Sequence, residues 1–301
     1  MSIRAGLISI MLRRTIKKQM AALTDPAKMR EGTGGFSSKL PKEVVIERID
    51  AGGVPAEWVD WPGAAEDAVM LYLHGGGYVF GGPDSHRDLA WRLAKEAGLR
   101  VLVADYRLAP EHQFPAAVDD ATACYRFLLE QGFTPDRIVV AGDSAGGGLA
   151  AALIVNLKNL GMTLPAATLL ISPWVDLAKT GASLYENADK DAMLSPEAIT
   201  RFADFYLGDT NPKAPLASPI FADLSEFPPT LVLVGSTEVL LSDSLTLVEK
   251  INASGGSAQL EIWPKMPHVF PLLAAIIPEG RKAVVQMGEF VRSHLNTVAL
   301  D

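Results

Sequence analysis

The arrangement of short apolar runs along the chain limits its fold more than any other feature. Four runs are almost continuously apolar, as in strands that helices cover on both faces: 68–73, 100–105, 137–141 and 230–234. Two further strand candidates are 167–171 and 258–263. Helical patterns separate most of these runs, at 84–97, 115–131, 145–160, 242–254 and 280–297. This alternation predicts βαβ crossovers and an α/β fold with a doubly wound, mostly parallel sheet.

The remaining segments add a hairpin and two regions that do not fit the sheet. Residues 42–49 and 54–61 flank Asp-Ala-Gly-Gly and predict two antiparallel strands, which brings the sheet to eight strands. Residues 179–219 break the alternation and contain a helix candidate that begins at Ser195, so an insertion here could cover a site as a lid. Residues 31–38 form a flexible linker by composition.

The N-terminal segment resembles a secretory signal over only its first few residues. Four positive charges within residues 13–18 stand where a small-residue cleavage site should lie. An amphipathic helix fits better, with Ile3, Leu7, Met11 and Met20 spaced along one face. Its basic face could touch a membrane surface. We nevertheless expect the helix to pack on its own chain and the protein to be cytoplasmic.

Charge, cysteine content and hydropathy exclude several classes of protein. The net charge of −8, with no Lys/Arg stripe, argues against a nucleic-acid partner. The one cysteine, Cys124, cannot form an internal disulfide and lies in an apolar helical stretch, which predicts a buried thiol. No apolar run reaches the roughly 18 residues that span a bilayer. We therefore expect no stable insertion into a membrane.

One pentapeptide has the pattern of a catalytic serine. Gly142-Asp143-Ser144-Ala145-Gly146 is the only Gly-x-Ser-x-Gly in the sequence. The pattern is weak alone, but it follows the strand candidate 137–141 and precedes a helix-forming run. A nucleophile elbow requires this strand–turn–helix context, because small neighbours let a strained turn present the hydroxyl. The sequence therefore predicts Ser144 as a nucleophile.

A glycine-rich loop lies 70 residues before this serine. His74-Gly75-Gly76-Gly77 follows the strand candidate 68–73. Glycines let backbone N–H groups approach a ligand closely, and acyl transfer needs such donors where an oxyanion develops. The dinucleotide pattern Gly-x-Gly-x-x-Gly fails here, because Phe80 occupies the sixth position from Gly75. The loop therefore predicts an oxyanion hole.

The catalytic base can be sought by elimination among the five histidines. His74 belongs to the glycine loop, His86 opens a helix, and His294 lies in the last predicted helix. His112 lies in a Pro-rich segment. His268 follows the last strand candidate, where a loop can reach back over the sheet. When a nucleophile elbow starts such a triad, the order along the chain is nucleophile, acid and base, so the base should come last. The histidines show no metal-binding spacing, so neither a metal nor another cofactor is expected.

The acid that orients the base has two candidates after the strand 230–234. Glu238 lies three residues past Gly235, on the loop where a partner of the histidine should project. Asp243 lies at the start of the next helix, where a carboxylate stabilises the helix terminus. Both acids can hold an imidazole tautomer. We favour Glu238 and keep Asp243 as the alternative acid.

These motifs together resemble the bacterial hormone-sensitive-lipase-like esterases, also called family IV, within the α/β-hydrolase superfamily. The resemblance covers nearly the whole chain after residue 40. It rests on five blocks in the expected order: His-Gly-Gly-Gly (74–77), Asp-Tyr-Arg-Leu-Ala-Pro-Glu (105–111) with Phe-Pro-Ala (114–116), Gly-Asp-Ser-Ala-Gly-Gly (142–147), Ser-Pro-Trp-Val-Asp-Leu (172–177) and the His268 loop. The family usually has Asp-Pro-Leu where this chain has Glu238-Val239-Leu240, and Asp243 matches the second acid of that motif.

The resemblance implies an α/β-hydrolase fold with a helical cap and with oxyanion donors from the backbone of Gly76, Gly77 and Ala145. We accordingly expect three parts: N-terminal cap helices over 1–40, a cap insertion over 179–215, and a catalytic domain formed by 41–178 and 216–301. The motifs also imply the class of reaction. We expect a carboxylesterase that hydrolyses short-to-medium-chain acyl esters through an acyl-enzyme intermediate.

Two other functions and one partner stay open. An amidase or peptidase would use the same triad. A non-catalytic ligand-binding homologue would use the same scaffold, as the plant gibberellin receptor does, although that receptor lacks the catalytic histidine. Besides a small-molecule ester, a second copy of the chain is the one partner considered, since the edge strand 258–263 could pair between subunits.

Overall fold

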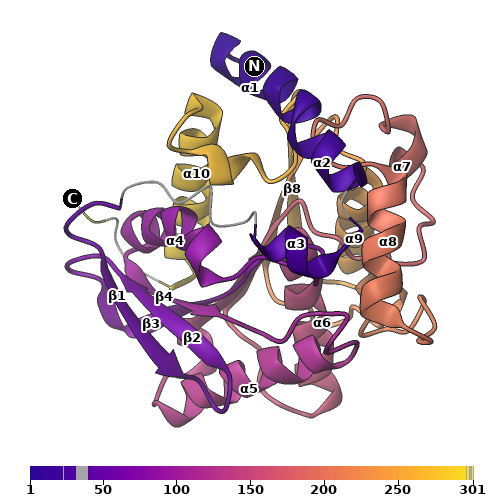
Figure 1. Ribbon diagram of the computed structural model, residues 1–301. Helices are drawn as coiled ribbons and strands as arrows, with labels where there is room; N and C mark the ends of the chain where they lie inside the picture. Colours follow the sequence, from indigo (N-terminus) through magenta and orange to yellow (C-terminus); the bar gives the residue numbers. More distant parts are fainter. Residues whose placement is uncertain (23, 32–39, 296, 298–299, 301) are drawn as a thin grey trace.

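Eight strands form one sheet in the computed structural model, which describes residues 1–22, 24–31, 40–295, 297 and 300 (Figure 1). The order across the sheet is β1-β2-β4-β3-β5-β6-β7-β8. β2 pairs antiparallel with both of its neighbours, and every other pair is parallel. The strands are β1 (Val45–Asp50), β2 (Pro55–Asp60), β3 (Ala65–Leu73), β4 (Leu99–Ala104), β5 (Ile138–Asp143), β6 (Ala167–Ile171), β7 (Thr230–Gly235) and β8 (Ala258–Trp263).

The strands lie within a few residues of their predicted positions, and the N-terminal hairpin is antiparallel as predicted. β5, β6 and β7 are buried along their whole length, which explains their continuous apolar sequences. The predicted α/β fold, mostly parallel and eight-stranded, is confirmed. β8 forms one edge of the sheet. Pairing of this edge with a second copy stays a prediction.

Helices cover both faces of the sheet and create two apolar cores (Figure 1). α4 (Pro83–Ala97) and α10 (Pro278–Leu295) pack on the face that presents Met70 and Val101. α5 (Ala116–Glu130), α6 (Ala145–Asn159) and α9 (Leu241–Ala253) contribute to the core on the opposite face, which includes Leu71 and Val140. Adjacent strand residues therefore serve different cores, as the alternation of side chains in a strand requires.

The other helices belong to the two regions that did not fit the sheet. The N-terminal region forms α1 (Ile3–Arg14), α2 (Ile16–Ala22) and α3 (Pro26–Glu31), and the later region forms α7 (Ser183–Glu186) and α8 (Pro196–Leu207). α2 packs against α8, so the two regions are in contact. Short 3-10 helices are η2 (Pro135–Arg137), η3 (Pro219–Phe221) and η4 (Phe270–Leu273). Apart from Glu31, the predicted linker 31–38 lies outside the described residues, as does position 296 of the last predicted helix.

The packing face predicted for the N-terminal helix is wrong. Ala5 and Leu12 are the buried residues of α1, whereas Ile3, Leu7 and Met11 are exposed. Apolar residues lie on the outer side of α1 as well as on its buried side, so their spacing alone does not identify the side that packs. None of the described helices combines the length and the apolar character that are needed to cross a bilayer.

The cysteine lies on α5 in the core opposite α4. Cys124 is fully buried there, as predicted. Burial raises the pKa of its thiol to about 12, with a smaller contribution from the nearby Asp120 and Asp50 carboxylates. The thiol is therefore protonated at neutral pH and is a poor nucleophile.

Candidate active site

Ser144 occupies a sharp turn between β5 and α6, with φ of 54° and ψ of −123°. The residues on either side of the turn must be glycines, because other backbone segments approach too closely to leave room for a Cβ. A Cβ at Gly142 would lie 2.3 Å from the carbonyl oxygen of Gly146, and a Cβ at Gly146 would lie 2.1 Å from that of Leu73. The predicted strand–turn–helix is therefore present, and the partly exposed hydroxyl sits at the carboxyl end of β5.

Three side chains that are far apart in the sequence meet at this turn. Nε2 of His268 lies 2.9 Å from Oγ of Ser144, and Nδ1 of His268 lies 2.6 Å from Oε2 of Glu238. Glu238 comes from the loop after β7, and His268 from the loop after β8. Both are buried. The structure thus brings together the nucleophile, base and preferred acid candidates.

The carboxylate of Glu238 is held at both of its oxygens. Oε2 contacts His268, while Oε1 accepts a hydrogen bond of 2.8 Å from Oγ of Ser172 and another from the backbone N–H of Gly235. The hydroxyl of Ser172 in turn accepts a hydrogen bond from the N–H of Val269. Ser172 therefore connects the acid to the loop that carries the histidine. It lies in the Ser-Pro-Trp block, but that block alone did not reveal this contact.

The environment of His268 sets its affinity for a proton. Burial lowers the pKa of the imidazole, but the charge of Glu238 and the hydrogen bond to it outweigh burial. The net pKa lies above the ordinary value of about 6.5. An imidazole in this position can accept a proton from Ser144 and is stabilised when it carries the positive charge.

Asp243, the alternative acid, faces another part of the molecule. Its Oδ2 accepts hydrogen bonds of 2.9 Å from the backbone N–H groups of Val175 and Asp176. Among the described residues it makes no hydrogen bond to His268. Burial and the neighbouring Asp176 carboxylate raise its pKa well above the usual range. Asp243 does lie in the first turn of α9, as predicted, but its side chain is hydrogen-bonded to the backbone of the 172–177 block.

The glycine loop can be built only from residues without a side chain. Gly76 has a φ of +125°, and a Cβ there would lie 1.9 Å from the carbonyl oxygen of Phe80. A Cβ at Gly77 would lie 2.8 Å from the ring of Phe202. Within the described part of the chain, the N–H groups of Gly76 and Gly77 have no hydrogen-bond acceptor. Ala145 is the first residue of α6, where helix N–H groups have no intrahelical partner.

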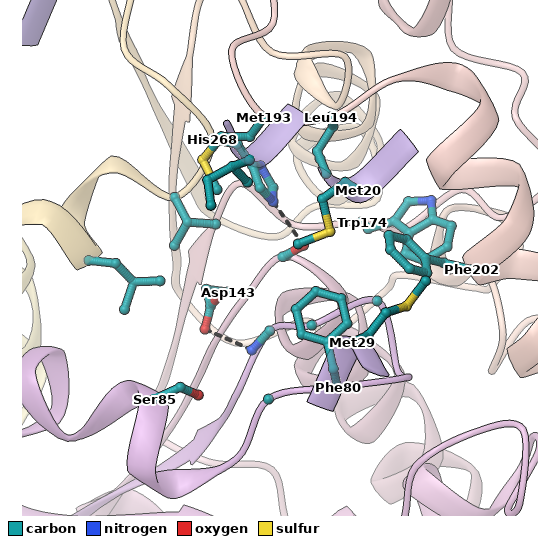
Figure 2. A pocket seen from close by; sticks show the side chains of 18 of the residues that line it. Met20, Met29, Phe80, Ser85, Asp143, Trp174, Met193, Leu194, Phe202 and His268 are labelled. Carbon is teal, nitrogen blue, oxygen red and sulfur yellow. Dashed lines mark hydrogen bonds between the residues drawn. The ribbon is translucent and has the colours of Figure 1, made fainter. Parts of the chain in front are cut away.

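The nucleophile turn opens into a largely apolar cavity of about 200 Å³. Figure 2 shows Met29, Phe80, Trp174 and Phe202 gathered on one side of it, while Asp143 and Ser85 lie on the other side in this view. Residues from both predicted cap regions line the cavity: Leu12, Ile16, Gln19, Met20 and Met29 from the N-terminal helices, and Met193, Leu194, Ile199 and Phe202 from the later segment. The boundaries of a separate cap stay a prediction.

Comparison with known proteins identifies the family. A family model described as alpha/beta hydrolase fold matches residues 70–272. The chain belongs to the α/β-hydrolase family. The hydrolase is 45% identical to an acetyl-hydrolase of Streptomyces hygroscopicus, over 81% of this chain and 82% of that protein. It is 38% identical to an esterase of Acinetobacter venetianus, over 83% of this chain and 82% of the relative.

Solved structures give the same assignment at the level of the fold. An esterase of the bacterial hormone-sensitive lipase family superposes on the hydrolase with a TM-score of 0.93, at 44% identity, covering 98% of this chain and 99% of the other. The esterase EstE5, soaked with p-nitrophenyl butyrate, gives a TM-score of 0.93 at 38% identity, covering 99% and 100%. The resemblance to hormone-sensitive-lipase-like esterases is thereby confirmed, in agreement with the predicted class of carboxylesterases.

Three of the other histidines of the hydrolase, His74, His112 and His294, make no hydrogen bond to Ser144 in the described structure. His74 stacks on Tyr106, with 4.3 Å between the ring centroids, and burial lowers its pKa to about 3. His112 is exposed, and Nδ1 of His294 lies 2.8 Å from the carbonyl oxygen of Phe290. Among the described residues, no group of three or more His, Cys, Asp or Glu side chains is arranged to hold a metal ion.

The sequence did not reveal the surroundings of Asp143, the residue before Ser144. Its Oδ1 accepts hydrogen bonds from the hydroxyl of Tyr72, at 2.8 Å, and the N–H of Gly75, at 3.0 Å. Nε2 of His86 lies 3.1 Å from the same oxygen. Burial would raise the pKa of Asp143, but the contacts with His86 and Tyr72 hold it below its usual range. An ionised carboxylate therefore lies beneath the glycine loop.

Proposed function

We propose that the protein is a carboxylic ester hydrolase with Ser144 as nucleophile, His268 as general base and Glu238 as the acid that orients the base. One observation carries this proposal. The distances of 2.9 Å from Ser144 to His268 and 2.6 Å from His268 to Glu238 form a continuous chain of hydrogen bonds, in which the base can take the serine proton while the acid holds the base in place. Asp243 has no contact of this kind in the described structure and fits a structural role.

In the first half of the reaction the serine becomes acylated. His268 takes the proton of Ser144 at Nε2 while Oγ attacks the carbonyl carbon of the ester. The N–H groups of Gly76, Gly77 and Ala145 hold the oxyanion, and each donor contributes about 3 kcal/mol to the transition state. The tetrahedral intermediate then collapses, and His268 protonates the alkoxide as it leaves. Glu238 stabilises the imidazolium between these two transfers.

In the second half water replaces the alcohol. His268 removes a proton from the water, whose oxygen attacks the acyl carbonyl, and the same N–H groups hold the second oxyanion. Collapse releases the carboxylic acid and returns the proton to Ser144. The two half-reactions need no group beyond the side chains and N–H groups named here, so no cofactor is part of the proposal.

The cavity supports short-to-medium acyl esters as substrates. Its volume of about 200 Å³ is smaller than the roughly 300–1,000 Å³ of sites for drug-sized ligands. The Met29, Phe80 and Phe202 side chains provide an apolar wall for an acyl chain. One relative bears the name acetyl-hydrolase, and a solved relative was soaked with p-nitrophenyl butyrate. These names support the same class of substrate.

Two measurements test the proposal. A fluorophosphonate should label Ser144 covalently, and p-nitrophenyl esters of increasing acyl length should be hydrolysed fastest at short-to-medium lengths. Matched esters and amides assayed side by side distinguish an esterase from an amidase or peptidase. A chain that binds the ester without turnover and without labelling would instead be a non-catalytic ligand-binding homologue.

A further inference from the structure

The outer face of α1 is apolar, although it is exposed. Ile3, Leu7, Ile10 and Met11 expose 85%, 63%, 53% and 47% of their surfaces. Their spacing of three, four and seven residues places them on one side of the helix, opposite the buried Leu12. Figure 1 shows α1 at the periphery of the molecule, on the side away from α5. An apolar surface of this kind marks a site of interaction.

Positive charge accompanies this apolar face. Residues 1–24 contain five of the 27 basic residues of the chain and none of its 35 acidic residues. Arg4 and Arg14 are exposed and share a stripe with Leu7 and Met11, at intervals of three and four residues. Arg13 and Lys17, by contrast, donate to backbone carbonyls within residues 188–191, and so belong to the internal packing.

One carboxylate approaches the beginning of the helix, and it is already engaged. Glu279, at the start of α10, accepts hydrogen bonds from the N–H and the hydroxyl of Ser2. The basic and apolar side chains of the outer face make no such contact in the described structure. Their arrangement is the one that suits an interfacial helix, whose apolar side chains enter the boundary of the lipid while its cations meet the headgroups.

We infer that the outer face of α1, formed by Ile3, Arg4, Leu7, Ile10, Met11 and Arg14, binds the surface of an anionic phospholipid bilayer. Charge complementarity favours this partner over a second copy of the chain. Two such faces packed against each other would bring the Arg4 and Arg14 cations of both copies into one interface, where like charges repel, whereas anionic headgroups attract them. The acidic remainder of the chain is repelled by the same surface, so binding orients the molecule with α1 toward the lipid.

This binding would place the substrate cavity beside the lipid. Leu12 and Ile16 line the cavity from the inner side of the N-terminal helices, and Met20 extends the same wall. One short helical segment thus has the bilayer on its outer side and the cavity on its inner side. An ester dissolved in the bilayer would then be released next to the site.

Sedimentation of the full chain with vesicles tests the inference. The wild-type chain should bind vesicles of phosphatidylcholine and phosphatidylglycerol, and should bind pure phosphatidylcholine much more weakly. Each cation near an anionic surface adds roughly fivefold to binding, so Arg4→Gln/Arg14→Gln should lower the partition coefficient about 25-fold. Leu7→Ser/Met11→Ser should lower it by at least about tenfold, because these side chains would no longer enter the lipid boundary.

Matched controls separate this effect from general surface properties. Leu160, directly after α6, and Leu245, on α9, expose 48% and 42% of their surfaces, so Leu160→Ser/Leu245→Ser should bind vesicles like the wild type. Arg126→Gln gives the corresponding control for charge. All variants should keep the wild-type melting temperature, because the substituted side chains are exposed. These comparisons do not depend on the hydrolytic activity.

Three results would overturn the inference. The first is a wild-type chain that does not bind the anionic vesicles. The second is equal binding by the wild type and the α1 variants, or equal losses in the α1 and control variants. The third is a wild-type dimer in vesicle-free light scattering that Leu7→Ser/Met11→Ser converts to a monomer, because a second copy would then cover this face.

Discussion

The backbone N–H of Gly75 donates a hydrogen bond of 3.0 Å to Oδ1 of Asp143. Gly75 begins the glycine loop and Asp143 ends β5, so this contact joins the loop directly to the nucleophile turn. The donors proposed for the oxyanion come from these two segments. Their separation is therefore fixed within the folded protein before a substrate arrives, as electrostatic preorganisation requires.

Asp143→Asn tests this connection. The substitution keeps the size of the side chain but removes the charge that pairs with His86. We expect kcat to fall up to about 100-fold, with little change in KM, because a small displacement of the loop weakens oxyanion binding. The pKa of His86 should also fall: burial lowers it, and Asp143 is the main cause of its raised value. Steady-state kinetics and NMR titration of His86 measure both effects, and unchanged values would contradict the role.

Ser144→Ala removes the proposed nucleophile. We expect kcat to fall by roughly 10⁴–10⁶, the loss typical of a serine hydrolase deprived of its nucleophile. The variant should also lose fluorophosphonate labelling while keeping the wild-type melting temperature. Wild-type turnover in the variant would refute the assignment.

Glu238→Gln and Asp243→Asn, assayed side by side, identify the acid. Glu238→Gln should lower kcat by about 10⁴, because an amide stabilises neither the required tautomer nor the imidazolium. Asp243→Asn should keep most of the turnover, since the amide oxygen can still accept the hydrogen bonds from Val175 and Asp176. The opposite result, with only the Asp243 variant inactive, would reverse our choice.

The pH dependence should report the raised pKa of His268. The base acts when neutral, so kcat/KM should rise with pH through a pKa above about 6.5. Glu238→Gln removes the main cause of the upward shift, so that burial, which acts downward, is opposed only by the smaller effects of the Asp191 and Asp143 charges. The acidic limb of its residual activity should therefore move to lower pH. A flat profile between about pH 5 and 9 would contradict a histidine base.

Gly76→Ala tests the shape of the glycine loop against a matched control. Both Gly76 and Gly53 have a positive φ, but a Cβ at Gly53 meets nothing within 4 Å, whereas one at Gly76 would lie 1.9 Å from the oxygen of Phe80. Gly53→Ala should lose about 1–2 kcal/mol of stability and keep its kcat. Gly76→Ala should lose about 100-fold or more in kcat. Equal kinetics for the two variants would exclude a special role of the loop.

The strands and the three proposed triad residues could be predicted because their signals are local. The buried strands required continuous apolar runs, and Gly142 and Gly146 were required by a turn that leaves no room for a Cβ. Glu238 was preferred over Asp243 from its distance to the end of β7, and the structure sets Glu238 against His268. These features depend on the order of residues within one strand and its following loop.

Contacts between distant segments gave no such signal. Nothing near His86 or Ser172 in the sequence indicates that the first pairs with Asp143 and the second with Glu238. The first contact joins α4 to the end of β5, and the second joins the segments that follow β6 and β7, so both depend on the assembled fold. The packing side of α1 was assigned to the wrong face for a related reason. The helix has apolar residues on both its outer and its buried side, and only its contacts with the rest of the chain determine which side packs.

The buried position of Cys124 has a practical consequence. Its thiol stays protonated and inaccessible in the folded chain, so thiol-directed reagents should leave the wild-type protein unmodified. A cysteine introduced at an exposed position such as Leu7 would then be the single reactive sulfur. A fluorophore or spin label could be attached there without first removing a native cysteine. The depth of α1 at a lipid surface thereby becomes directly measurable by spectroscopy.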